Sequence, residues 1–318
     1  MKPKFIFSLG VGWSGTTSLY YTLKNMKYVH TGPLKEIQSL DTYYDKSNKD
    51  KELDIYDRFI DLLKVCTRTH EDNNLNKITE KDINYILGPS RSWKKYIQYY
   101  LNLYQYVKDD YQAVGDFSNV MLLDEHYFKE VISELSKHFD VKCLLSLRDP
   151  VRRAWAHAGA YCNLDETRYF YKFSKVNSLH PCISDNIFDS FEAASSGKNY
   201  VKIINTYYNI FGKENVCYLV MEEFFDNREN NSEVSKLEQF LGVNIPEVYP
   251  CVFVPDRGIN PPQIEGLADQ WMSDTEILTP EFYNSARNSL FFDQIYSEFE
   301  ELHGSLPADW GRPIDYDY

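Results

Sequence analysis

The feature that most constrains this chain is a glycine-rich turn between a short apolar stretch and an amphipathic one. Residues 4–9 read KFIFSL, which is typical of a buried strand. Residues 10–19 read GVGWSGTTSL, and the apolar positions of residues 15–27 recur at three-to-four spacing, as in a helix. Backbone N–H groups at such a turn and at the start of the helix can cradle an anion. The sequence therefore predicts a strand, a phosphate-binding loop and a helix in direct succession.

The turn departs from the loop of nucleoside triphosphatases at one position. In the pattern G-x-x-x-x-G-K-[ST], the lysine reaches the β- and γ-phosphates. Gly10, Gly15 and Thr17 fit the spacing, but Thr16 stands where the lysine belongs. We therefore disfavour a P-loop kinase or NTPase and favour a ligand with a shorter 5′ phosphate chain. The loop residues expected to bind it are Gly12, Trp13, Ser14, Gly15, Thr16, Thr17 and Ser18.

Strand and helix patterns alternate along the rest of the chain. Further strands are predicted at 113–115, 141–147 and 215–220, and helices near 122–138, from 150, near 198–211, 232–241 and 280–302. This alternation indicates an α/β, P-loop-like, three-layer fold with a central parallel sheet flanked by helices. Residues 41–110 are polar and carry helical patterns near 51–66, 79–87 and 91–107. We predict one domain over 1–318 with a helical insertion at about 41–110.

Composition excludes several classes of partner. A net charge of −13 argues against non-specific nucleic-acid binding, which depends on basic surface. No stretch approaches the ~20 apolar residues of a membrane helix, and the short apolar run at the start does not resemble a targeting segment. The six cysteines form no C-x-x-C pair, which favours a reducing, cytoplasmic location, and the seven histidines show no metal-ligand spacing. We expect no nucleic acid, membrane or metal partner.

Three segments resemble the PAPS-dependent sulfotransferases, which use 3′-phosphoadenosine 5′-phosphosulfate (PAPS) as donor. The SGTT of residues 14–17 resembles their 5′-phosphosulfate loop, (K/R)-(S/T)-G-T-(T/R). Residues 144–157 read LLSLRDPVRRAWAH and resemble their 3′-phosphate element, in the form found in carbohydrate (heparan-sulfate-type) and bacterial members. The GDFS of residues 115–118 is similar to a strand-end motif that these enzymes carry just upstream.

The resemblance implies roles for particular residues. Arg148 would pair with the 3′-phosphate, and Arg257 with Gly258 resembles a late (R/K)-G element that closes over it. Residues 35–40 read KEIQSL and look like the segment that carries the catalytic glutamate of glycan sulfotransferases. Glu36 would then be the general base, with Lys35 beside it. Cytosolic members use a histidine instead, for which His30 and His70 are the nearest candidates.

Three positions depart from the family pattern and bear on activity. Trp13 stands where the family carries Lys or Arg, Ala156 where a serine contacts the 3′-phosphate, and Phe117 where the upstream motif is basic. Loss of the loop cation matters most, because electrostatic stabilisation often dominates catalysis. Either Lys35 supplies the charge, or the enzyme is slow, or the protein binds PAPS or its product 3′,5′-ADP without turnover. The sequence leaves the acceptor, a carbohydrate or small metabolite, and the oligomeric state open.

Overall fold

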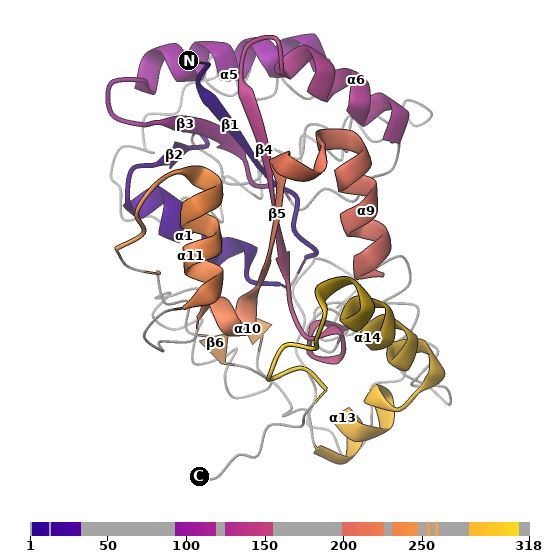
Figure 1. Cartoon of the computed structure of the whole chain (residues 1–318). Coiled ribbons are helices and arrows are strands. Elements are labelled where there is room, and N and C mark those ends of the chain that lie inside the picture. Colours follow the sequence, from indigo (N-terminus) through magenta and orange to yellow (C-terminus); the bar gives the residue numbers. More distant parts are fainter. Residues whose placement is uncertain are drawn as a thin grey trace, which may run out of the picture. The chain divides into compact units, whose positions relative to one another are not determined.

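The fold contains a five-stranded sheet with the strand order β2-β3-β1-β4-β5 (Figure 1). The computed structural model describes residues 2–12, 14–32, 93–118, 125–154, 199–225, 231–246, 248, 253–254, 258–259 and 280–311. The strands are β1 (Lys4–Ser8), β2 (Val29–His30), β3 (Ala113–Asp116), β4 (Asp140–Leu147) and β5 (Val216–Val220). Strand β1 pairs in parallel with both β3 and β4, and β2 pairs in parallel with β3. The predicted α/β class and parallel central sheet are confirmed, whereas β2 was not predicted.

Helices alternate with these strands along the chain. They are α1 (Thr16–Asn25), α5 (Trp93–Val107), α6 (Glu125–Leu135), α9 (Tyr200–Phe211), α10 (Met221–Phe224), α11 (Ser232–Leu241), α13 (Pro280–Arg287) and α14 (Leu290–His303), with a short 3-10 helix at Lys213–Asn215. The helix predicted near 280–302 is in fact two helices. Ser289 separates them, because its side chain accepts a hydrogen bond from Phe292 N and so caps α14. None of the described helices is long and apolar enough to cross a membrane.

The aromatic side chains of β1 anchor the sheet to its helices. Phe5 and Phe7 share one face of the strand because successive side chains alternate. The ring of Phe5 lies 4.7 Å from that of Tyr100 in α5, measured between centroids. The ring of Phe7 lies 6.0 Å from Phe128 in α6 and 5.7 Å from Phe211 in α9. Burial of each Phe side chain stabilises the fold by about 1.5–3 kcal/mol. Strand β1, from which the loop continues, is therefore anchored in a well-packed core.

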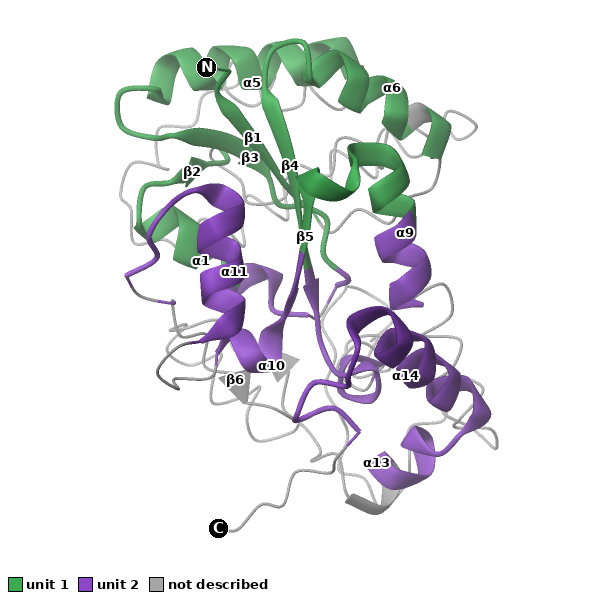
Figure 2. Cartoon of the chain, in the orientation of Figure 1, with its two compact units in different colours: residues 1–10, 19–145, 206–217 green, residues 11–18, 146–205, 218–318 purple. Residues whose placement is uncertain are grey.

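The chain divides into two compact units (Figure 2). Unit 1 comprises residues 1–10, 19–145 and 206–217, and unit 2 comprises residues 11–18, 146–205 and 218–318. Unit 2 thus contains the predicted phosphate loop, the end of β4 and the C-terminal helices. The organisation as one domain with an insertion at 41–110 stays a prediction, since of that insertion the structure describes only residues from 93 onward.

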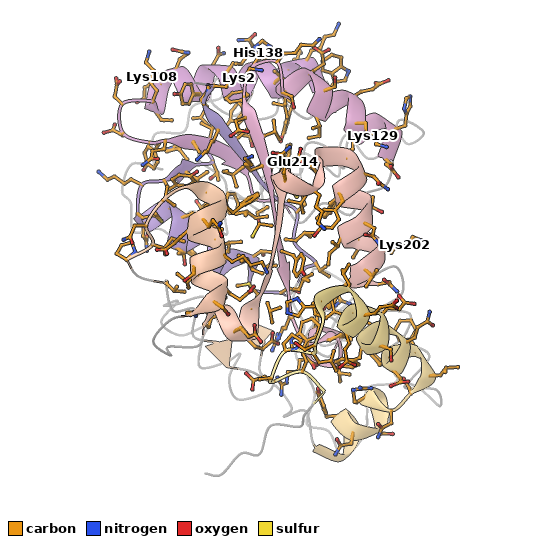
Figure 3. The ribbon with its side chains drawn as sticks, in the orientation of Figure 1. Lys2, Lys108, Lys129, His138, Lys202 and Glu214 are labelled. Carbon is orange, nitrogen blue, oxygen red and sulfur yellow. The ribbon has the colours of Figure 1, made fainter. Side chains whose placement is uncertain are left out.

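Charged side chains on the outer face of α6 are solvated ion pairs. Lys129 extends from this helix (Figure 3), and its Nζ lies 2.7 Å from a carboxylate oxygen of Glu125. Both side chains are 46% exposed, and pairs of this kind contribute about 0–1 kcal/mol. The opposite face of the helix buries Phe128, Val131 and Leu135. The charged side chains of this pair are therefore ordinary solvated groups on a helix surface.

We predict that His30 makes stability depend on pH. Burial lowers the pKa of His30, and the charge of Lys24 lowers it further. Its Nδ1 accepts a hydrogen bond from Gly32 N at 2.9 Å, which a protonated ring cannot do. The unfolded chain therefore binds a proton more readily than the folded one, so stability is retained above the unfolded pKa of about 6.5 and falls as pH drops below it.

Denaturation curves at pH 7.5 and pH 5.5 measure this effect. The variant His30→Asn keeps a side-chain acceptor for Gly32 but does not titrate, so it should lose less stability over this interval than the unaltered protein. Equal losses in the two proteins would contradict the prediction.

Candidate functional site

The loop between β1 and α1 is shaped by a left-handed glycine. Gly15 has a φ of 76°, a conformation that L side chains rarely adopt. A Cβ built on Gly15 would lie 2.9 Å from Met221 Cε, so the loop also packs tightly against the first residue of α10. Ser18 N donates to Gly15 O at 3.1 Å and begins the helical hydrogen bonding. A Cβ built on Gly12 would meet no described atom within 4 Å, which leaves space beside the first part of the loop.

Ser14 and Ser18 present buried hydroxyl groups in this loop. Both residues are 0% exposed, and neither Oγ has a hydrogen-bond partner among the described residues. A buried hydroxyl without a partner costs about 1–3 kcal/mol, so native proteins seldom retain one. Buried Thr16 and partly exposed Thr17 open α1, where the first backbone N–H groups lack intrahelical acceptors. The loop therefore offers donors that suit an anion with several oxygens.

Arg148 directly follows β4, the neighbour of β1 in the sheet. Its side chain is 1% exposed, and its carbonyl accepts a 2.6 Å hydrogen bond from the hydroxyl of Tyr200. The next backbone N–H, that of Asp149, donates to Glu222 Oε1 at 2.9 Å. Loop 11–18 and Arg148 both belong to unit 2 (Figure 2). The two elements expected to bind phosphates thus follow neighbouring parallel strands within one compact unit, the position where α/β folds bind ligands.

Arg148 acts electrostatically on two other buried ionisable groups. Burial raises the pKa of Glu222 above its usual range, and the positive charge of Arg148 opposes that rise. Burial lowers the pKa of Arg153, Tyr200 opposes this, and Arg148 lowers it further. The charge of Arg148 therefore influences the pKa of both Glu222 and Arg153.

Asp149 is a buried carboxylate with several donors. Its Oδ1 accepts from Arg152 N at 2.9 Å, which caps the helical turn after β4. Its Oδ2 accepts from Tyr283 OH at 2.8 Å, from Tyr296 OH at 2.7 Å and from Gly311 N at 3.1 Å. Asp149 is 0% exposed. The acid of the Arg-Asp-Pro segment thus joins the end of β4 to the C-terminal part of the chain.

Residues 115–118 are structural within unit 1. Asp116 accepts from Ser118 N at 3.0 Å through Oδ1 and from Tyr96 OH at 2.8 Å through Oδ2. Phe117, at the position where the resemblance calls for a basic residue, is 0% exposed and packs its ring 5.4 Å from that of Tyr20. A cation at this position would be buried among aromatic rings. The substitution to Phe is therefore explained by packing.

Several predicted site residues lie outside the described residues: Trp13, Lys35, Glu36, His70 and Arg257. Gly258 is described as the first residue of β7 (Gly258–Ile259), which pairs antiparallel with β6 (Phe253–Val254). The base, its neighbouring lysine and the late phosphate contact consequently stay predictions. Among the described residues, no group of three or more His, Cys, Asp or Glu side chains is arranged to hold a metal ion.

Sequence reasoning missed the partners of the Arg148 segment. Glu222 had a usable signal, because an acid two residues after a predicted strand lies near the carboxyl edge of the sheet. Trp310, whose Nε1 donates to Glu222 Oε2 at 3.0 Å, had none. Tyr200, Tyr283 and Tyr296 likewise contact this segment from 52 to 147 positions further along the chain. No spacing rule connects residues so far apart.

Comparisons with known proteins identify the family. The model of the sulfotransferase domain matches residues 4–253, about four-fifths of the chain. Similar solved structures include a sulfotransferase from Alicyclobacillus acidocaldarius, with 20% identity, a TM-score of 0.49 and coverage of 98% of this chain and 100% of that one. Another is the sulfotransferase domain of the olefin synthase from Synechococcus PCC 7002, with 17% identity, a TM-score of 0.45 and coverage of 96% and 95%. A search of curated protein sequences finds no match. From the family match over most of its length, the chain belongs to the sulfotransferase domain family.

Proposed function

We propose that this protein is a PAPS-dependent sulfotransferase that transfers a sulfuryl group to a hydroxyl or amine of a carbohydrate or small-molecule acceptor. The observation that carries the proposal is the pair of buried Ser14 and Ser18 hydroxyls, which lack partners among the described residues of a loop that opens a helix. Family membership and the position of Arg148 after the neighbouring strand support the same ligand.

The described residues suit the two charged ends of this nucleotide. The loop hydroxyls and the first N–H groups of α1 would hold the 5′-phosphosulfate, since both are donors. Arg148 would hold the 3′-phosphate, because a guanidinium forms strong charge-assisted bonds with phosphate oxygens. The bound donor supplies an activated sulfuryl group whose leaving group is the phosphate of 3′,5′-ADP. Buried Thr16 provides no cation for a γ-phosphate, which disfavours ATP and GTP.

The remaining chemistry is assigned to Glu36 and Lys35. As the acceptor oxygen or nitrogen attacks sulfur, its proton must be removed, and a positioned carboxylate is an effective general base. A lysine beside it balances charge near the transferring group, a task that Trp13 cannot perform. The side chains of Cys143 and Cys217 are buried, and a cytoplasmic location is part of the proposal.

A second candidate function is binding of PAPS or 3′,5′-ADP without turnover. Trp13, at the position of the loop cation, favours it. Transfer of radiolabelled sulfate from PAPS to a panel of sugar and phenol acceptors distinguishes the two. Transfer that depends on Glu36 supports the enzyme, and stable nucleotide binding without transfer to any acceptor supports the binding protein.

The nucleotide assignment predicts a selective thermal shift. The melting temperature should rise with 3′,5′-ADP and should not rise with ATP or GTP at the same concentration. At a ligand concentration of 100 times Kd, the stabilisation is about 2.7 kcal/mol, which is readily measured. Stabilisation by ATP alone would instead support a kinase or NTPase.

Arg148 is predicted to contribute directly to affinity. A hydrogen bond to a charged group is worth about 1.5–3 kcal/mol, so Arg148→Ala should weaken 3′,5′-ADP binding about ten- to a hundred-fold. Lys236→Ala is a matched control, because it removes a cation of unit 2 whose Nζ lies 3.1 Å from Glu233. Calorimetry at low salt measures both. Unchanged affinity in Arg148→Ala would remove this residue from the site.

Glu36 is predicted to act on rate and not on nucleotide affinity. Removal of a positioned base typically reduces rate 10²–10⁴-fold, so Glu36→Gln should lose nearly all transfer while its Kd for 3′,5′-ADP stays within about two-fold. Single-turnover sulfate transfer and calorimetry give the two values. Full activity would move the base elsewhere, with His30 the next residue to replace. Equal losses of binding and rate would mean that Glu36 supports the loop structurally.

A further inference from the structure

The peptide group that links Arg148 to Asp149 is hydrogen-bonded through both its carbonyl and its N–H. Its carbonyl accepts from Tyr200 OH at 2.6 Å, and the N–H that follows donates to Glu222 Oε1 at 2.9 Å. One partner comes from α9 and the other from α10. Two hydrogen bonds to one peptide group fix its plane and hold the main chain immediately after the Cα of Arg148. The long guanidinium side chain therefore starts from a defined position.

A second set of hydrogen bonds is accepted by the carboxylates of Glu222 and Asp149. Glu222 Oε2 accepts from Trp310 Nε1 at 3.0 Å. Asp149 Oδ2 accepts from Tyr283 OH at 2.8 Å and from Tyr296 OH at 2.7 Å. The three donors belong to α13, α14 and the turn beyond α14, all within unit 2. The C-terminal part of the chain is thus bonded to the segment that carries Arg148 through two carboxylates.

The tyrosine hydroxyls are permanent donors in this arrangement. Burial and the charge of Asp149 raise the pKa of both Tyr283 and Tyr296, so both stay protonated at physiological pH. Their rings have separate contacts: the guanidinium of Arg152 lies 5.5 Å from the centroid of Tyr283, and that of Arg287 lies 4.0 Å from Tyr296. Replacing each tyrosine with phenylalanine would therefore remove the hydroxyl and keep the ring packing.

We infer that Asp149 and Glu222 are positioning residues for nucleotide recognition, and that Tyr283, Tyr296 and Trp310 act through them to aim Arg148 at the 3′-phosphate. This inference rests on the proposed function, since it assumes that Arg148 meets that phosphate. It makes the segment 280–311 part of the donor site even though none of its residues is assigned a ligand contact. Selectivity for a 3′-phosphate then depends on residues more than 130 positions after Arg148.

The test compares two ligands that differ in the 3′-phosphate. Calorimetry gives the Kd of 3′,5′-ADP and of 5′-AMP for the unaltered protein and for the double variant Tyr283→Phe/Tyr296→Phe. Two hydrogen bonds to a carboxylate are lost, so affinity for 3′,5′-ADP should fall about ten-fold, while that for 5′-AMP should stay within about two-fold. Tyr218→Phe is the matched control, because it removes a tyrosine hydroxyl of unit 2 that lies 3.1 Å from His303 Nδ1 of α14.

The possible results separate this inference from the proposed function. A ten-fold loss of preference for 3′,5′-ADP in the double variant, with the preference kept in Tyr218→Phe, supports positioning. A lower melting temperature with an unchanged preference would show a merely structural role and overturn the inference alone. Equal loss in the control variant would overturn it as well. Absence of 3′,5′-ADP binding by the unaltered protein would overturn the proposed function and this inference with it.

Discussion

The buried carboxylate of Asp149 is the interaction on which the candidate site depends. Asp149 stands at the carboxyl edge of the sheet, where β4 ends and the chain must turn. An ionised carboxylate is costly to bury, and it is stable here because both oxygens accept hydrogen bonds, from Arg152 N on one side and from Tyr283, Tyr296 and Gly311 on the other. The same bonds that satisfy the charge fix the end of the strand. Satisfying one buried acid thereby orders the backbone that presents Arg148.

The segment that follows β5 connects this arrangement to the phosphate loop. Val220 N donates to Glu233 Oε2 at 2.7 Å, which ties the strand end to α11. Met221 packs against Gly15, since a Cβ on Gly15 would lie 2.9 Å from Met221 Cε. Glu222 accepts a hydrogen bond from Asp149 N. Val220, Met221 and Glu222 thus contact α11, the loop and the segment of Arg148, respectively. Because all of these lie in unit 2, the parts expected to meet the two phosphates of one nucleotide share a single packed scaffold.

The chemistry that the chain can perform follows from what this scaffold offers. The loop presents hydroxyl and backbone donors but buries Thr16 at the position where triphosphatases carry lysine. Such a loop can bind an anion, whereas it has little with which to stabilise charge at a γ-phosphate. Transfer of a sulfuryl group requires a base and is helped by a nearby cation, and Glu36 and Lys35 are the residues proposed for these roles, since Trp13 carries no charge. Under this proposal, catalytic strength depends on how Glu36 and Lys35 meet the transferring group.

The sequence alone determined several local elements and the family, but not β2 or the break at Ser289. Apolar periodicity placed β1, β4 and α11 because strand and helix patterns are properties of neighbouring residues, and the motifs around Gly15 and Arg148 indicated a sulfotransferase, which the family match confirms. Only the tertiary structure decided which side chains bond to Asp149 and Glu222. Tyr283 lies 134 positions from Asp149 in the chain, and Trp310 lies 88 positions from Glu222. Hydrogen bonds between distant residues leave no periodic trace in a sequence, since they depend on how helices pack and not on spacing along the chain.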